Sequence, residues 1–305
     1  MRLDKFLVKQ TGFSRNQISN LIKNSLVKVN NKIITKPSFD VCDNDNIEYE
    51  IKQATSNKSK EVDFDVEIIY EDDDILVVNK PSGLVVHDAP SVKEATLVDW
   101  LKSKNISLST ISGEERHGIV HRIDKDTTGA LVIAKNNYAH QFLSEQLQDK
   151  SMGRIYLAII DIPIKENIEI NRPIGRNPKN RLKKAIIPNA KEAKTRFIPL
   201  CDNRIVACKL FTGRTHQIRV HLSSINRHII GDKLYGNDDK CRMMLHAYIL
   251  YLVHPTTKQK MIFEAPIFDD MKEKINSICK DRDHEINKEY IISRFDNFGD
   301  YRLFE

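Results

Sequence analysis

Short apolar runs separated by turn residues dominate the chain from about residue 62 onward. Runs of this length that are rich in β-branched residues are typical of buried strands rather than helices. Apolar residues at helical spacing are fewer, and they predict only short helices between the strands. We expect strands at residues 66–70, 75–78, 118–120, 130–134, 154–160, 194–199 and 204–210, and helices near residues 97–101, 136–149, 218–225 and 270–280.

The first 51 residues have a different pattern and predict a small separate domain. Two short amphipathic segments, the second capped by Ser14, precede an alternating stretch around Asn30 and Asn31 that favours a hairpin. Residues 52–61 have no apolar periodicity, which indicates a flexible linker. We therefore divide the chain into a small domain (1–51), a linker (52–61), a large domain (62–280) and an extension (281–305) to which the pattern assigns no role.

Charge is unevenly distributed along the 305 residues, although the formal net charge is only +6. Residues 171–235 contain 15 Lys or Arg against 3 Asp or Glu, whereas residues 61–74 contain 8 acidic residues and no basic one. A long basic block favours a polyanionic partner such as nucleic acid. A solvated basic face without a ligand is the alternative.

Other features exclude several classes of protein. The apolar runs are too short to span a membrane, and the charged N-terminus lacks the apolar core of a signal peptide. The five cysteines are scattered and form no Cys-x-x-Cys pair, which argues against a disulfide framework and favours a reducing cytoplasm.

The stretch from His117 to Lys135 contains the strongest candidate for chemistry. Apolar residues on both sides enclose a polar, turn-forming centre in which Asp124 follows Arg122. A carboxylate held between two buried strands would have a rigid support, as a reactive group requires. The local residues taken alone favour a plain turn that only reverses the chain.

Residues 121–129, His-Arg-Ile-Asp-Lys-Asp-Thr-Thr-Gly, resemble the signature of the RluA-type RNA pseudouridine synthases, with mild departures at Ile123 and Thr128. Further stretches resemble this family in the same order. They are Asn-Lys-Pro-Ser-Gly-Leu-Val-Val-His (79–87), Arg-Ile-Tyr-Leu-Ala (154–158), Thr-Gly-Arg-Thr-His-Gln-Ile-Arg (212–219), Gly-Asp-x-x-Tyr-Gly (231–236) and Leu-His-Ala (245–247).

The resemblance implies an isomerase that converts uridine to pseudouridine in RNA. It assigns the reacting carboxylate to Asp124, its paired cation to Arg219 and the base-stacking ring to Tyr156, while Thr215 is the expected N-cap of the helix that carries Arg219. It further implies substrate-binding roles for Arg122, His121, Leu245, Lys80 and Arg214.

The small domain resembles the αL-type RNA-binding fold that also occurs in a ribosomal small-subunit protein. This implies phosphate contacts at Arg15, Lys23 and Lys28, and the basic stretch 172–184, which reads as an irregular loop, adds Arg176, Lys183 and Lys184. The fold implied is α+β: a mixed, mainly antiparallel sheet with flanking helices, preceded by the αL-type domain.

The sequence indicates neither a metal nor a cofactor. His117 and His121 are four residues apart, but Gly118 and the β-branched residues between them disfavour a helical ligand pair, and no Walker-type stretch occurs. We expect ribosomal RNA of the large subunit, or its precursor particle, as partner of a cytoplasmic monomer, with no membrane and no protein partner. Transfer RNA as substrate, or a non-catalytic RNA-binding module for ribosome assembly, are the alternatives.

Overall fold

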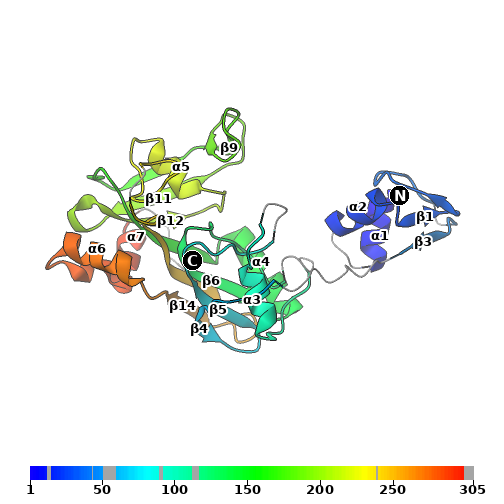
Figure 1. The fold of residues 1–305 in the computed structure, drawn as a ribbon, viewed down its shortest axis with the longest axis horizontal. Helices are drawn as coiled ribbons and strands as arrows, with labels where there is room; N and C mark the ends of the chain where they lie inside the picture. The colour runs from blue at the N-terminus through cyan, green and yellow to red at the C-terminus, as the bar shows by residue number, and fades with distance from the viewer. Residues whose placement is uncertain are drawn as a thin grey trace.

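The computed structural model describes residues 1–11, 15–42, 44–50, 60–88, 92–111, 117–237 and 240–298, without the side chains of 16, 17 and 20. It shows the predicted α+β fold, with a small N-terminal unit and a large domain built on a nine-stranded sheet (Figure 1). Most residues of the expected linker, and Ser14, lie outside the described residues. Lys60, at the end of that expected linker, contacts the large domain, where its ammonium pairs with Asp88.

The small unit consists of two helices packed on a three-stranded sheet. Leu3 and Leu7 of the first helix and Ile18 and Ile22 of the second are fully buried, as their helical spacing predicts. The expected hairpin is present, and both Asn30 and Asn31 adopt positive φ, which this turn type requires. The elements are α1 (Leu3–Thr11), α2 (Arg15–Lys23), β1 (Val27–Val29), β2 (Lys32–Ile33) and β3 (Ile47–Tyr49).

The large sheet has the strand order β4-β5-β6-β13-β7-β12-β11-β8, and β14 also pairs with β13. Every pairing is antiparallel except that of β6 with β13. The sheet is therefore mixed and mainly antiparallel, as expected. Its strands are β4 (Glu67–Glu71), β5 (Ile75–Lys80), β6 (Thr128–Ala134), β7 (Gly153–Ile159), β8 (Ile168–Asn171), β11 (Lys194–Pro199), β12 (Ile205–Leu210), β13 (Leu245–Val253) and β14 (Lys260–Glu264).

The parallel contact between β6 and β13 lies directly after the stretch that contains Asp124. Gly129 pairs with Ala247 there, and a Cβ atom on Gly129 would lie 2.3 Å from the Ala247 carbonyl oxygen. Gly129 also has φ +110°, a conformation that other residues rarely adopt. Only glycine allows the two backbones to approach this closely.

Helices cover the sheet at both ends (Figure 1). In α3 (Leu97–Ser103), Thr96 and Asp99 form a capping box, and Asn136 caps α4 (Asn137–Asp149), so both predicted helices are confirmed. The expected closing helix is α6 (Asp269–Cys279), and α5 (Gln217–Ser223) packs on the core. No helix in the described ranges is long and apolar enough to cross a membrane.

Two local predictions are wrong. Residues 118–120 form no strand, since Ile119 makes only an isolated bridge to Ile133. The stretch 172–184 is not an irregular loop, because β9 (Ile174–Arg176) pairs with β10 (Lys184–Ile186) in an ordered hairpin. Apolar content alone did not separate a buried turn from a strand, and the basic residues of the hairpin masked its short alternating strands.

The C-terminal extension is part of the core through residue 298. It forms η3 (Asp283–Ile286) and α7 (Lys288–Asp296), whose Ile291 and Phe295 are buried against the sheet. The sequence argument against disulfides is wrong for one pair, because Cys201 and Cys279 are bonded. Their separation of 78 residues carries no sequence signal, and only the packing of α6 beside η2 (Cys201–Asn203) brings them together.

Candidate active site

Asp124 lies in the turn that leads into β6, and both ends of this turn are fixed. Ile123 is buried in the sheet core, and the Thr127 N–H donates to the Asp124 carbonyl. The Lys125 carbonyl accepts from the Gly83 N–H. The Asp124 carboxylate is left 18% exposed at the wall of a cavity, so it is both held in place and accessible.

Lys80 supports this turn and does not line the cavity, which corrects the expected substrate contact. Its side chain is fully buried, and the ammonium donates to the carbonyl oxygens of Pro81, Leu84 and Lys125 at 2.8–2.9 Å. Burial lowers the Lys80 pKa to about 7, against the opposing pull of Asp126 and Asp124. Lys80 therefore fixes the turn from below rather than contacting a ligand.

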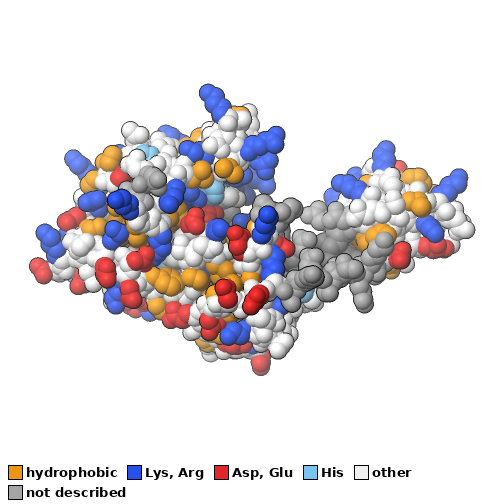
Figure 2. All heavy atoms as spheres, viewed as in Figure 1, with side chains coloured by type: hydrophobic (Ala, Val, Ile, Leu, Met, Phe, Trp, Pro, Cys, Tyr) orange, Lys and Arg blue, Asp and Glu red, His pale blue; other side chains and the backbone are white. Residues whose placement is uncertain are grey.

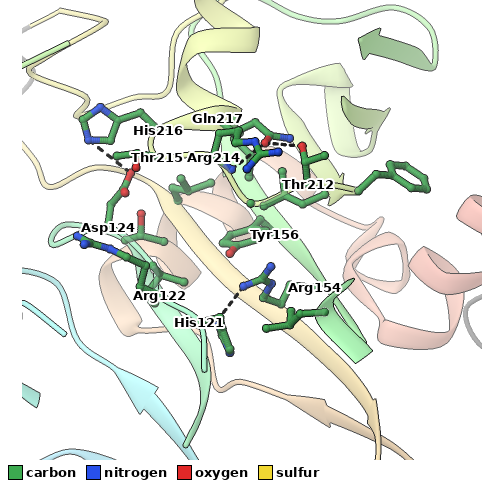
Figure 3. Close-up of a pocket in the computed structure, with 18 of the residues that line it drawn as sticks. His121, Arg122, Asp124, Arg154, Tyr156, Thr212, Arg214, Thr215, His216 and Gln217 are labelled. Carbon is green, nitrogen blue, oxygen red and sulfur yellow. Dashed lines mark hydrogen bonds and ion pairs between the residues drawn. The ribbon is translucent and has the colours of Figure 1, made fainter. Parts of the chain in front are cut away.

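The cavity has a volume of about 320 Å³ and is lined by all the predicted catalytic and substrate-binding residues except Lys80 (Figure 3). Residues from four separate stretches of sequence meet at its walls, which supports the view that these stretches serve one function. The predicted residues that line it are Asp124, Tyr156, Arg219, Arg122, His121, Leu245 and Arg214.

Arg219 contacts two carboxylates rather than one. Its Nη1 is 3.3 Å from an Asp124 oxygen, so the expected pair is present. The stronger contact is with Asp232, which accepts from Nε and Nη2 at 2.7 Å each. Burial alone would raise the Asp232 pKa, but the Arg219 charge and hydrogen bonds lower it. Sequence reasoning gave Asp232 no role, although a buried Arg beside the 231–236 stretch could have signalled it.

The N-cap of the helix that carries Arg219 lies one residue later than predicted. His216, not Thr215, is the N-cap of α5, with φ 59° and no capping side chain. The His216 Nε2 lies 3.9 Å from the Asp124 carboxylate, and its Nδ1 is 3.0 Å from the Tyr235 hydroxyl. Burial lowers the His216 pKa, so this ring is neutral at physiological pH.

Tyr156 occupies the centre of β7, between strands β12 and β13. Its neighbours across the sheet are Cys208 and Ala247, and only 5% of the residue is exposed. Burial raises the Tyr156 pKa; the Arg154 charge partly offsets this rise, and the Asp124 charge adds a smaller one. The phenol is therefore neutral at physiological pH, and its ring forms a rigid wall.

His121 and Arg154 form a buried pair at the base of the cavity (Figure 3). The Arg154 Nη1 donates to His121 Nδ1 at 2.7 Å. Burial and the neighbouring Arg154 charge hold the His121 pKa well below its usual value. Sequence reasoning assigned Arg154 no role, although its position two residues before Tyr156 places both side chains on one face of the strand.

The remaining predicted residues lie at the rim or away from the cavity. Arg122 is exposed, with Nη1 3.4 Å from His87, and Arg214 donates to the Glu192 carbonyl. Arg15 is paired with Asp4 but remains 61% exposed at its side chain. Lys23 and Lys28 are exposed on the small unit, and Arg176 is exposed on the β9–β10 hairpin.

The β9–β10 hairpin connects to the site through Tyr235. The Lys183 ammonium lies 5.7 Å from the centre of that ring, and the Lys184 N–H donates to its hydroxyl. Figure 2 shows basic side chains gathered around this hairpin. Within the described ranges, no three His, Cys, Asp or Glu side chains are grouped to hold a metal ion.

Sequence models of two families match the chain. The family described as RNA pseudouridylate synthase matches residues 74–224, and the S4 domain matches residues 1–47. A protein of Helicobacter pylori (strain J99) named "Uncharacterized RNA pseudouridine synthase" is 45% identical over 96% of this chain and 95% of its own length. The "Ribosomal large subunit pseudouridine synthase D" of Zymomonas mobilis is 37% identical over 89% of this chain and 92% of its own.

Solved structures show the same fold at lower sequence identity. The structure titled "Human RNA Pseudouridylate Synthase Domain Containing 4" aligns with a TM-score of 0.55 at 22% identity, over 70% of this chain and 92% of its own. At this identity the likeness supports the fold of the large domain, while the sequence matches carry the family.

Proposed function

The chain belongs to the RNA pseudouridine synthase family, and from this membership we propose that it modifies specific uridines of large-subunit ribosomal RNA with Asp124 as the reacting carboxylate. Its activity is an isomerisation, in which the uracil is detached from the ribose at N1 and rejoined through C5. The observation that carries the site assignment is the position of Asp124, which is fixed in its turn and accessible from a cavity beside Arg219.

Two features support a ribosomal substrate. Relatives named ribosomal large subunit pseudouridine synthase D, from Zymomonas, Neisseria and Vibrio species, are 32–37% identical over most of the chain. The N-terminal unit matches an S4 domain and presents Arg15, Lys23 and Lys28 at its surface. Exposed cations on a separate unit are suited to holding the RNA backbone at a distance from the reacting uridine.

Asp124 has two possible roles in the reaction. Its carboxylate can attack C1′ of the ribose, or it can remove the C2′ proton, and either role allows the C1′–N1 bond to break. Arg219 attracts and orients the carboxylate. Because Asp232 holds the other side of the guanidinium at 2.7 Å, Arg219 is itself fixed in direction.

The walls of the cavity suit an everted base, since a uridine paired in a helix cannot reach Asp124. Tyr156 would stack on the uracil and Leu245 would pack against it. A neutral Tyr156 phenol cannot accept a proton, so any part in removing the C5 proton requires the phenol to ionise after the RNA is bound. Arg122, exposed at the rim, would fill the space left in the RNA.

The remaining parts of the proposal concern organisation. Residues 1–51 would serve as the RNA-binding domain, residues 62–280 as the catalytic domain, and Arg176, Lys183, Lys184 and Arg214 as contacts to the RNA around the uridine. We place the protein in the cytoplasm, where ribosomal RNA is available to it, and expect it to act as a monomer.

The experiment is to map pseudouridine in ribosomal and transfer RNA from cells with and without the gene. The proposal predicts that one or more sites in large-subunit ribosomal RNA disappear and return when the gene is restored. If sites were lost only from transfer RNA, transfer RNA would be the substrate instead. Survival of every site in both RNAs would contradict the proposal.

A further inference from the structure

Arg154 presents a buried positive charge to the cavity. The residue is 8% exposed, lines the cavity and lies two positions before Tyr156 on β7 (Figure 3). Side chains at i and i+2 of a strand share a face, so Arg154 and Tyr156 face the same space. The Arg154 Nη2 lies 3.6 Å from the place where a Cβ on Gly213 would be, which puts the guanidinium against the glycine of the 212–219 stretch.

Among the residues that the structure describes, no carboxylate neutralises the charge of Arg154. Its hydrogen-bond partner in the described part of the chain is His121, whose low pKa keeps the ring neutral, and no described carboxylate forms an ion pair with it. The Nε atom is buried without a described partner. Burying a charge without a counterion is costly, so an anion that enters the cavity would be strongly favoured there.

We propose that Arg154 stabilises the negative charge that develops on the uracil ring when its bond to the ribose breaks. The inference rests on the proposed function of Asp124. As the C1′–N1 bond breaks, its electron pair passes to N1 and is shared with the O2 and O4 carbonyl oxygens. C1′ is then bonded to the Asp124 carboxylate, or joined to C2′ by a double bond if Asp124 has taken the C2′ proton.

In the second half of the reaction, the negative charge on the uracil is consumed as the new bond forms. C5 attacks C1′, and the carboxylate leaves or the C2′ proton is restored. The C5 proton is then lost and N1 gains a proton, so atoms and electrons balance. Arg154 gives up no proton in this sequence. It acts as a preorganised charge in a site shielded from water, where such interactions are strongest.

The position of Arg154 favours the base over a phosphate as its ligand. It is buried beside the ring of Tyr156, whereas Arg176, which is suited to a phosphate contact, is exposed. A uracil stacked on Tyr156 would bring a carbonyl oxygen toward the guanidinium, while its phosphate would stay near the rim. A phosphate contact is the alternative outcome of the test.

The test compares Arg154→Gln with the unaltered protein on two RNAs that contain uridine or 5-fluorouridine at the mapped site. The rate of cleavage of the C1′–N1 bond is measured in single turnovers with enzyme in excess. With uridine, Arg154→Gln should be slower by about 100-fold or more, as when one donor to a developing anion is removed. Fluorine stabilises the uracil anion, so the loss should be clearly smaller with 5-fluorouridine.

Further variants keep the result interpretable. Both RNAs are measured with the same preparation, so the folded fraction cancels in their ratio. Arg154→Lys keeps the charge and should recover part of the rate, whereas Arg196→Gln, which removes a guanidinium from β11 outside the cavity, should behave as the unaltered protein.

An equal loss of cleavage rate on both RNAs would overturn the inference. The inference would also fail if Arg154→Gln bound RNA more weakly, with a shallower dependence of affinity on salt, and this explained the slower rate, because that result would indicate a phosphate contact. Asp124→Asn serves as the reference. If the unaltered protein forms product and Asp124→Asn does not, the proposed function stands whatever Arg154→Gln does.

Discussion

Arg219 is the most constrained cation of the site because two carboxylates share its guanidinium. Asp232 is 1% exposed and holds two of its nitrogens, while Asp124 contacts the third at a longer distance. The geometry of the Asp124–Arg219 contact therefore depends on Asp232, a residue that has no direct access to the substrate.

Replacement of Asp232 by Asn should weaken both folding and catalysis. It leaves a buried guanidinium without its main counterion, which should lower the free energy of unfolding by about 3 kcal/mol. It should also slow product formation at saturating RNA, because Arg219 is free to turn. Urea unfolding and single-turnover rates measure the two effects, and Asp270→Asn, which breaks the exposed Arg242–Asp270 pair, is the control. Unchanged stability would contradict the role assigned to Asp232.

The same pair predicts a dependence of stability on pH. Because the Asp232 pKa is lowered in the folded protein, its contribution is complete above the unfolded value of about 3.9 and is lost as the pH falls through the folded value. The unaltered protein should therefore lose more stability than Asp232→Asn as the pH is lowered below about 4. Parallel acid profiles for the two proteins would exclude this linkage.

The motifs predicted that Asp124, Tyr156 and Arg219 would share one site, and the three residues do line the same cavity. The sequence was not sufficient for Lys80, which shares a motif with the site but is buried below it. It also missed Asp232 and Arg154, because their importance comes from what lies beside them in space. Local sequence patterns do not reveal a contact between residues that are 13 or more positions apart.

At the scale of elements, the junction of β6 and β13 positions the Asp124 turn. Gly129→Ala would place a methyl group 2.3 Å from the Ala247 carbonyl oxygen, so the strands must separate. We expect a loss of about 3 kcal/mol in stability and a fall in activity in the fraction that folds.

Gly83→Ala is the matched control. Gly83 also has positive φ, at +81°, but no atom lies within 4 Å of the Cβ position. This change should cost only about 1 kcal/mol from backbone strain. Thermal or urea unfolding measures both variants, and similar losses would show that the close approach at Gly129 has no special effect.

Elements with strong local signals were predictable, while those defined by partners were not. Helical spacing identified α3 and α4, with Thr96 as the expected cap of α3, and β-branched runs identified β5, β6 and β7. The β9–β10 hairpin has half-exposed strands of only three residues, and α7 is stabilised by burial of Ile291 and Phe295 against distant strands. Neither feature is visible in a window of the sequence.

For the whole molecule, RNA binding should be divided between the small unit and the hairpin. Lys23→Ala with Lys28→Ala removes two exposed cations from the former, and Arg176→Ala with Lys183→Ala removes one exposed and one half-buried cation from the latter. Removal of one cation that binds a phosphate should reduce the slope of log affinity against log salt by about 1. Lys272→Ala, at an exposed position of α6, should leave the slope unchanged. If neither double variant altered the slope of log affinity against log salt, the RNA would have to bind outside the small unit and the hairpin.

The most direct measurement is pseudouridine formation by purified protein at a mapped uridine, with and without Asp124→Asn. Asparagine keeps the shape of the side chain but can neither attack C1′ nor remove a proton. We predict that Asp124→Asn binds the RNA as tightly as the unaltered protein and forms no product in a single turnover. Product formed by Asp124→Asn at the unaltered rate would show that another group performs the reaction.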